Sequence, residues 1–119
     1  TGEGAVVTYN YHILRPLTVY LEKVGDVNKL AMFFTVTPVT EIDSILWTLV
    51  AMDYGESVSD DQVRAWEDEI TAQDIRVLEH QRPELLPLDL QAEFHLVSDK
   101  LAIAYRKWLK SLGLTFGTA

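Results

Sequence analysis

The sequence predicts an α+β fold, with an antiparallel β-sheet in its first half and two helices in its second half. Runs of β-branched and aromatic residues, separated by turn residues, dominate the first half and are typical of strands. The second half instead repeats apolar residues three and four positions apart, which is the spacing of amphipathic helices. We expect the sheet to pack against the first and longer helix, since each has one apolar side to cover.

Four strands are expected within about residues 5–53: Ala5–Tyr11, His12–Val24, Leu30–Val39 and Ile45–Asp53. The segment Gly25–Asn28 has the composition of a hairpin loop between the second and third strands. The segment Pro38–Ser44 carries the next turn. Because these links are short, an antiparallel meander is the simplest topology.

A long helix is expected over about residues 60–81. Ser59 is a favourable N-cap, and Gln62 follows three residues later, as in a capping box. The helix should end before Pro83, because the residue before a proline avoids the helical region.

A second, shorter helix is expected over about residues 99–112. Ser98 or Asp99 can cap its N-terminus. Gly113 is a natural C-terminal stop, because glycine adopts the left-handed conformation that ends many helices.

Length and composition limit the classes of protein that remain. The 119 residues suffice for one domain, residues 1–119, and the absence of cysteine excludes disulfides and a self-contained iron–sulfur cluster. A net charge of −8 disfavours nucleic-acid binding, and no apolar run is long enough to cross a membrane. We expect a cytoplasmic protein. The first residue, Thr1, is not methionine, and we therefore expect that a segment was removed or that the chain is part of a longer reading frame.

The main basic cluster is expected on the second helix and comprises Lys100, Arg106, Lys107 and Lys110. A solvated helix face is the simpler interpretation of these residues. The functional alternative is a docking surface for an acidic electron-transfer protein.

Asp74 is the candidate functional residue of the long helix. On a helical wheel it lies about 20° from Val63, within the apolar stripe that also contains Ile70 and Val77. A carboxylate in such a stripe is costly to cover unless a metal, an arginine or protonation neutralises it. A hydrogen bond to the backbone, or an ion pair with an arginine such as Arg15, is the structural alternative.

The histidines do not define a metal site by spacing. They are His12, His80 and His95, and no two of them have the separation of a helical metal pair such as HExxH. A complete site of two histidines and one carboxylate within this chain would require His12 and His95 to converge.

The segment 67–88 resembles the C-terminal region of the large (alpha) subunits of Rieske oxygenases. The resemblance is carried by Gln73-Asp74, the run Glu79-His80-Gln81-Arg82-Pro83-Glu84 and the loop Leu86-Pro87-Leu88. The tail Ser98-Asp99 with 103–109, and the strand segments 15–18 and 36–39, are also similar. The branch around phenoxybenzoate dioxygenase and vanillate demethylase is the nearest in pattern.

The resemblance implies a helix-grip fold of the START or Bet v 1 type. It also implies a mononuclear Fe(II) held by two histidines and one aspartate, and the matching aspartate is Asp74. In this family a Rieske [2Fe–2S] centre passes electrons to the iron from a ferredoxin or reductase, and the iron activates dioxygen. Arg15, Ile70 and Val77 are the residues expected to line the substrate pocket. Arg15 can instead form an ion pair within the fold.

This sequence also departs from the family pattern. The cysteines and histidines of the Rieske motif are absent, and so are the paired histidines of the iron site. We therefore expect a chain that is inactive alone and binds no stoichiometric iron. It would be part of an oxygenase that hydroxylates or O-demethylates an aromatic compound, and a homodimer or larger homo-oligomer is expected. The alternatives are a stand-alone helix-grip module for a small apolar ligand and a dimerising interaction domain.

Overall fold

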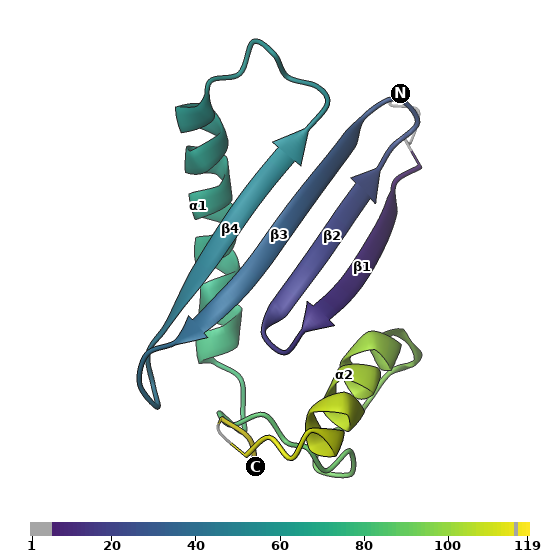
Figure 1. Ribbon diagram of the computed structural model, residues 1–119, viewed down its shortest axis with the longest axis vertical. Coiled ribbons are helices and arrows are strands. Elements are labelled where there is room, and N and C mark those ends of the chain that lie inside the picture. Colours follow the sequence, from purple (N-terminus) through teal and green to yellow (C-terminus); the bar gives the residue numbers. More distant parts are fainter. Residues whose placement is uncertain (1–5, 116) are drawn as a thin grey trace. The chain divides into compact units, whose positions relative to one another are not determined.

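The computed structural model describes residues 6–115 and 117–119, and the chain divides into two compact units. The first unit, Thr1–Ser57, holds all four strands. The second unit, Val58–Ala119, holds the helices (Figure 1). Ala5, the expected start of the first strand, lies outside the described residues. This α+β composition confirms the predicted fold class, while the packing of the long helix on the sheet stays a prediction.

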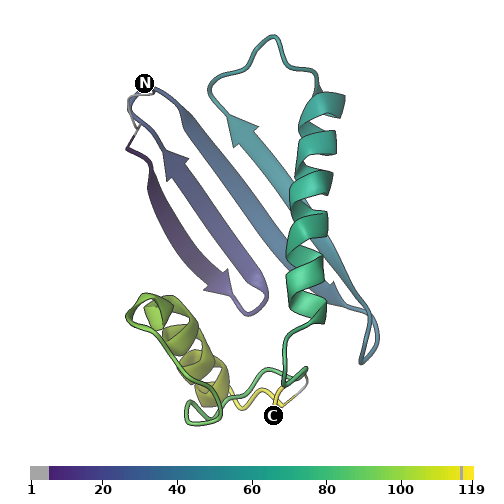
Figure 2. The same cartoon turned by 180° about the vertical axis from the view of Figure 1, so that it is seen from behind.

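The first unit is a four-stranded antiparallel meander. Figures 1 and 2 show the strands side by side in chain order, β1-β2-β3-β4. Each strand pairs with the next in the antiparallel sense, as the short links predicted. The strands are β1 (Thr8–Arg15), β2 (Thr18–Val24), β3 (Lys29–Pro38) and β4 (Ser44–Met52).

The turn between the first two strands corrects one sequence-based boundary. The expected strand His12–Val24 is wrong at its start, because β1 continues to Arg15 and the chain reverses at Pro16 and Leu17. Proline suits the first central position of a tight turn, and Leu17 takes the second with a positive φ of 62°. A leucine rarely adopts this conformation, so the apolar composition concealed the turn.

The other two turns lie where the sequence placed them. In the β2–β3 hairpin, the backbone N–H of Gly25 donates to the carbonyl of Asn28 at 2.8 Å. In the β3–β4 turn, the hydroxyl of Thr40 donates to the Asp43 carboxylate at 2.9 Å and accepts from the Asp43 N–H at 3.0 Å. Local side-chain bonds of this kind stabilise turns that would otherwise leave backbone groups unpaired.

Side chains of the sheet divide between two faces, each named after one of its residues. The Leu21 face carries the register row Tyr11, Leu21, Met32 and Val50. The Tyr20 face carries the adjacent row His12, Tyr20, Phe33 and Leu49. Leu21 is the most buried apolar side chain of the sheet, at 8% exposure.

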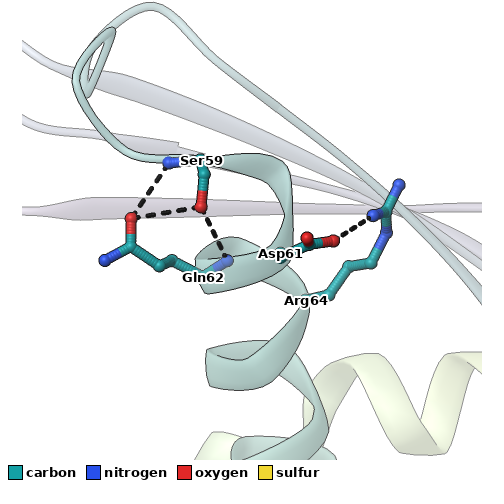
Figure 3. A network of polar contacts seen from close by, with 4 residues as sticks. All are labelled: Ser59, Asp61, Gln62 and Arg64. Atoms are coloured by element: carbon teal, nitrogen blue, oxygen red, sulfur yellow. Dashed lines mark hydrogen bonds and ion pairs between the residues drawn. The ribbon is translucent and has the colours of Figure 1, made fainter.

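The long helix α1 spans Asp60–Glu79 and begins with the predicted capping box (Figure 3). The N–H of Gln62 donates to the hydroxyl of Ser59, and the side-chain oxygen of Gln62 accepts from the Ser59 N–H at 3.1 Å. This exchange satisfies helix-end donors that would otherwise be unpaired. The helix ends at Glu79, two residues before the expected boundary at Gln81.

The short helix α2 spans Lys100–Ser111 and follows the single 3-10 turn η1 (Val97–Asp99). Asp99 is its N-cap by position, but its carboxylate accepts from the N–H of Leu96 at 2.7 Å. The C-terminus follows the prediction, because Gly113 has a φ of 68°. The N–H of Leu114 donates to the carbonyl of Leu109 at 3.2 Å, which closes a Schellman motif.

The second unit is closed by contacts between segments far apart in sequence. Leu86 and Thr118 form a parallel bridge, and the N–H of Leu88 donates to the Ala119 carbonyl at 2.9 Å. The side chain of Leu109 in α2 is 2% exposed, so it is the centre of a small core. Within the described part of the chain, no helix combines the length and apolarity needed to cross a membrane.

Replacing Leu109 with alanine tests this core. The Leu109→Ala variant should lose about 2–5 kcal/mol of unfolding free energy, because it removes buried methyl groups and leaves a cavity. The exposed substitution Lys107→Ala on the same helix should change it by less than about 0.5 kcal/mol. Urea denaturation of both variants measures the difference, and equal losses would contradict the assignment of the core.

Replacing Ser59 with alanine tests the cap of α1. The Ser59→Ala variant should lose about 0.5–2 kcal/mol, because a helix-end N–H loses its acceptor. Ser57→Ala is the matched control, since Ser57 is exposed and lies outside the capping box. Thermal unfolding followed by circular dichroism compares the two, and an unchanged midpoint for Ser59→Ala would count against the cap.

Candidate functional site

Asp74 lies in the third quarter of α1, and its side chain is exposed. Ile70 and Val77 lie one helical turn to either side of Asp74 and are 51% and 61% exposed. Leu78, four residues after Asp74, is 67% exposed. No residue of α1 is buried. The predicted apolar stripe around Asp74 is therefore a solvent-accessible surface of the helix in this structure.

Among the described residues of its own unit, the carboxylate of Asp74 has no protein partner. Across residues 58–115 and 117–119, no described residue forms a hydrogen bond or an ion pair with it. A bond from Asp74 to a nearby backbone group, one structural alternative, is thus absent from this part of the chain. The oxygens remain available to accept from a donor or to bind a cation.

Glu67 occupies the same stripe two turns earlier and has a different environment. It is half-buried, and this partial burial raises the pKa of its carboxyl above the usual range. Burial has this effect because it disfavours the charged form. Of the two carboxylates, Asp74 is the one more freely presented to solvent.

The three histidines have separate environments. The Nδ1–H of His80 donates to the carbonyl of Arg76 at 2.6 Å, a local bond at the end of α1. The ring of His12 lies 5.9 Å from that of Tyr20, centroid to centroid, on the sheet. The Nε2 atom of His95 is buried and has no hydrogen-bond partner among the described residues.

The described residues do not contain a complete iron site. Among the residues that the structure describes, no three or more histidine, aspartate or glutamate side chains are grouped so that they could hold a metal ion. A facial iron site needs two imidazoles and one carboxylate on the same metal. Asp74 fits the carboxylate position by its donor chemistry, and no described group of side chains completes the set.

The expected pocket residues fall in different units. Arg15 is exposed at the end of β1 in the first unit. Ile70 and Val77 flank Asp74 on α1 in the second unit. That these three residues line one substrate pocket therefore stays a prediction.

The basic cluster of α2 is smaller than the sequence predicted. Arg106 is not part of a solvated face, because its guanidinium pairs with the carboxylate of Glu93. The two side chains are only 12% and 23% exposed. Lys100, Lys107 and Lys110 are exposed, as expected. Arg106 therefore ties the loop before α2 to the helix, an interaction between residues thirteen positions apart that helical spacing cannot indicate.

One polar pair on the sheet was not predicted. The hydroxyl of Tyr20 donates to the carboxylate of Glu22 at 3.0 Å on the Tyr20 face. This bond to Glu22, with a smaller effect of burial, raises the pKa of the Tyr20 phenol above its usual range. The sequence could have indicated this pair, because Tyr20 and Glu22 are two positions apart and residues i and i+2 of a strand share a face.

The structure thus defines an α+β chain in which a four-stranded meander precedes a long capped helix that carries the exposed carboxylate of Asp74. The sequence profile of the family "Vanillate O-demethylase oxygenase C-terminal domain" matches residues 2–115. The chain belongs to this family, whose members are the C-terminal catalytic regions of Rieske oxygenase alpha subunits. This membership confirms the resemblance found in the helix, the tail and the strands.

Two relatives extend the comparison. The chain is 38% identical, over 98% of its length, to a probable methylxanthine N7-demethylase, NdmC, of Pseudomonas sp. (strain TJI-51). It also matches the structure of the Pseudomonas putida CBB5 NdmA QL mutant with theobromine, with a TM-score of 0.75 and 28% identity over 90% of the chain. The chain spans 42% of the length of the first relative and 32% of the second.

The raised pKa of Glu67 predicts how stability depends on pH. A carboxyl with a raised folded-state pKa destabilises the fold at neutral pH, and this cost disappears below the unfolded-state pKa. Glu67→Gln should therefore stabilise the chain at pH 7 and have a smaller effect near pH 3. Denaturation at both pH values measures this, with Glu69→Gln as the exposed control. A Glu67→Gln effect that grows as the pH falls would contradict the assigned cause.

Proposed function

We propose that this chain is the C-terminal part of the catalytic domain of a Rieske-type oxygenase, in which Asp74 supplies the carboxylate ligand of a mononuclear Fe(II). The complete protein would use dioxygen to oxidise an aromatic substrate. The observation that supports this most strongly is the unpaired, accessible carboxylate of Asp74 in a helix that matches the family over its whole length.

The chemistry of the helix face supports a cation at Asp74. An ionised carboxylate surrounded by Ile70, Val77 and Leu78 loses hydration when a substrate pocket or another protein segment covers it. A divalent cation offsets that loss and keeps the carboxylate charged. Asp74 would hold the Fe(II) as its carboxylate ligand, and the bound metal would supply the activation of dioxygen.

The remaining parts of the site would come from protein segments outside this chain. Two histidine ligands are needed, and the described residues do not provide them beside Asp74. The Rieske cluster needs two cysteines, and the sequence has none. Because the chain spans 42% and 32% of the two relatives, more than half of each relative's length is left for these parts. A ferredoxin or a reductase would supply the electrons.

Oxidative demethylation is the reaction that the relatives favour. One is named as a probable methylxanthine demethylase, and the matched family is named after vanillate O-demethylase. We propose a methylated aromatic or heteroaromatic ring as the substrate, with removal of an N-methyl or O-methyl group. Ile70 and Val77 would contact the ring beside the iron, and Arg15 would meet a polar substituent or pair within the fold.

Self-association accompanies this proposal. Trp47 and Leu49 on β4, and Trp66 on α1, are each more than half exposed. Apolar surface of this extent on a small chain favours contacts with further protein. A homo-oligomer of the complete protein would place some of this surface in interfaces.

The substitution Asp74→Ala in the complete oxygenase tests the role of this residue. Iron affinity should fall by more than about 100-fold, since losing a direct ligand costs more than losing a supporting hydrogen bond. Substrate-dependent dioxygen consumption should fall with it. Metal analysis and an oxygen electrode measure the two effects.

Asp68→Ala is the matched control, because Asp68 is an exposed carboxylate on the same helix. It should keep both iron and activity. Full iron content in Asp74→Ala would overturn the assignment of the ligand. Tight one-to-one Fe(II) binding by the 119-residue chain alone would show that the other ligands also lie within it.

A further inference from the structure

A groove crosses the Tyr20 face of the sheet at the end nearest the β2–β3 hairpin. Its floor is the register pair Ala31 and Ala51, on the neighbouring strands β3 and β4. The rows to either side contribute larger side chains to the lining, Tyr20 in one and Val24 and Lys29 in the other. Since each row lies about 7 Å from the next, two methyl groups between larger neighbours leave a shallow trough.

The size of the groove suits a small ligand. Its volume is about 310 Å³, which is at the lower end of the range for small-molecule sites. The alanine methyl groups present a flat apolar floor, so a planar ring can lie on it with its face in contact. All residues that line the groove belong to the first unit, and the site is therefore independent of the role of Asp74.

The polar groups of the groove are mainly acceptors. Glu22 occupies the same register row as Ala31, and the Tyr20 hydroxyl holds one of its oxygens at 3.0 Å. The other oxygen of Glu22 has no hydrogen-bond partner among the described residues. Asp53 adds a second carboxylate, and one of its oxygens accepts from the Lys29 N–H at 2.7 Å. Among the described residues of the lining, Lys29 is the only cation beside the two carboxylates, so these residues carry a net negative charge.

We propose that this groove binds a small flat ring that carries an N–H donor, with the ring over Ala31 and Ala51 and the donor directed at Glu22. The positioned carboxylate recognises the donor through a charge-assisted hydrogen bond, which is stronger than a neutral one. A flat anion is rejected, because two carboxylates face it at short range. The raised pKa of Tyr20 is consistent with this arrangement, since it keeps the phenol a neutral donor to Glu22.

Titration of the ¹⁵N-labelled 119-residue chain with 2-aminobenzimidazole tests the proposal by NMR. This probe is a flat bicyclic ring with N–H donors along one edge. The amide signals of Glu22, Ala31 and Ala51 should shift and saturate. Benzoate, a flat anion, should cause no saturable shift of the same signals.

Two variants and one control locate the binding. Glu22→Gln keeps the acceptor for Tyr20 but loses the charge, so it should weaken binding at least about tenfold. Ala31→Leu should fill the trough and abolish binding. Glu41→Gln, an exposed site in the β3–β4 turn, should leave binding unchanged. If Ala31→Leu does not fold, Glu22→Gln alone decides.

Three results would overturn the proposal: no saturable shift with the unsubstituted chain, equal affinity of Glu22→Gln, or benzoate binding at the same residues. None of them bears on iron binding by Asp74, so this proposal and the proposed function fail separately.

Discussion

The cost of covering an ionised carboxylate with apolar groups constrains what α1 can contact. Burying the stripe around Asp74 gains about 25 cal/mol for each Å² of apolar surface removed from water. The same cover dehydrates the carboxylate, which costs several kcal/mol when no partner compensates. A bound cation compensates the dehydration of the carboxylate, so the apolar stripe can be covered while Asp74 stays ionised. The proposal that Asp74 is an iron ligand rests on this energetic argument together with the resemblance of its helix to the oxygenase family.

A second constraint is the small amount of buried apolar surface in the chain. Leu21, Pro87 and Leu109 are the buried residues among those that the structure describes, although hydrophobic residues make up 48% of the sequence. A chain with so few buried apolar side chains has little stability to spare, so the loss of any one of them is costly. Further burial against other protein segments is consistent with the proposed larger catalytic domain and with the proposed oligomer.

Local sequence signals predicted most of the fold, because its elements depend on neighbouring residues. The cap at Ser59 and the stop at Gly113 are set within a few positions of the chain, and the structure confirms both. The turn at Leu17 was missed because an apolar residue adopts the glycine-like conformation. The ion pair of Arg106 with Glu93 was missed because it joins distant segments. The spacing of apolar residues in α1 indicated Asp74 as a candidate. The histidines that we propose as the other iron ligands lie outside this sequence, so the complete site could not be predicted from it.

The most direct test of the central claim is to determine the DNA sequence upstream of the Thr1 codon. The claim predicts a continuous reading frame that encodes a two-cysteine, two-histidine Rieske motif, followed by a pair of histidines for the iron. A start codon close to Thr1, with neither motif before it, would contradict oxygenase chemistry at Asp74. The groove over Ala31 and Ala51 would then remain as the candidate site of an independent binding protein.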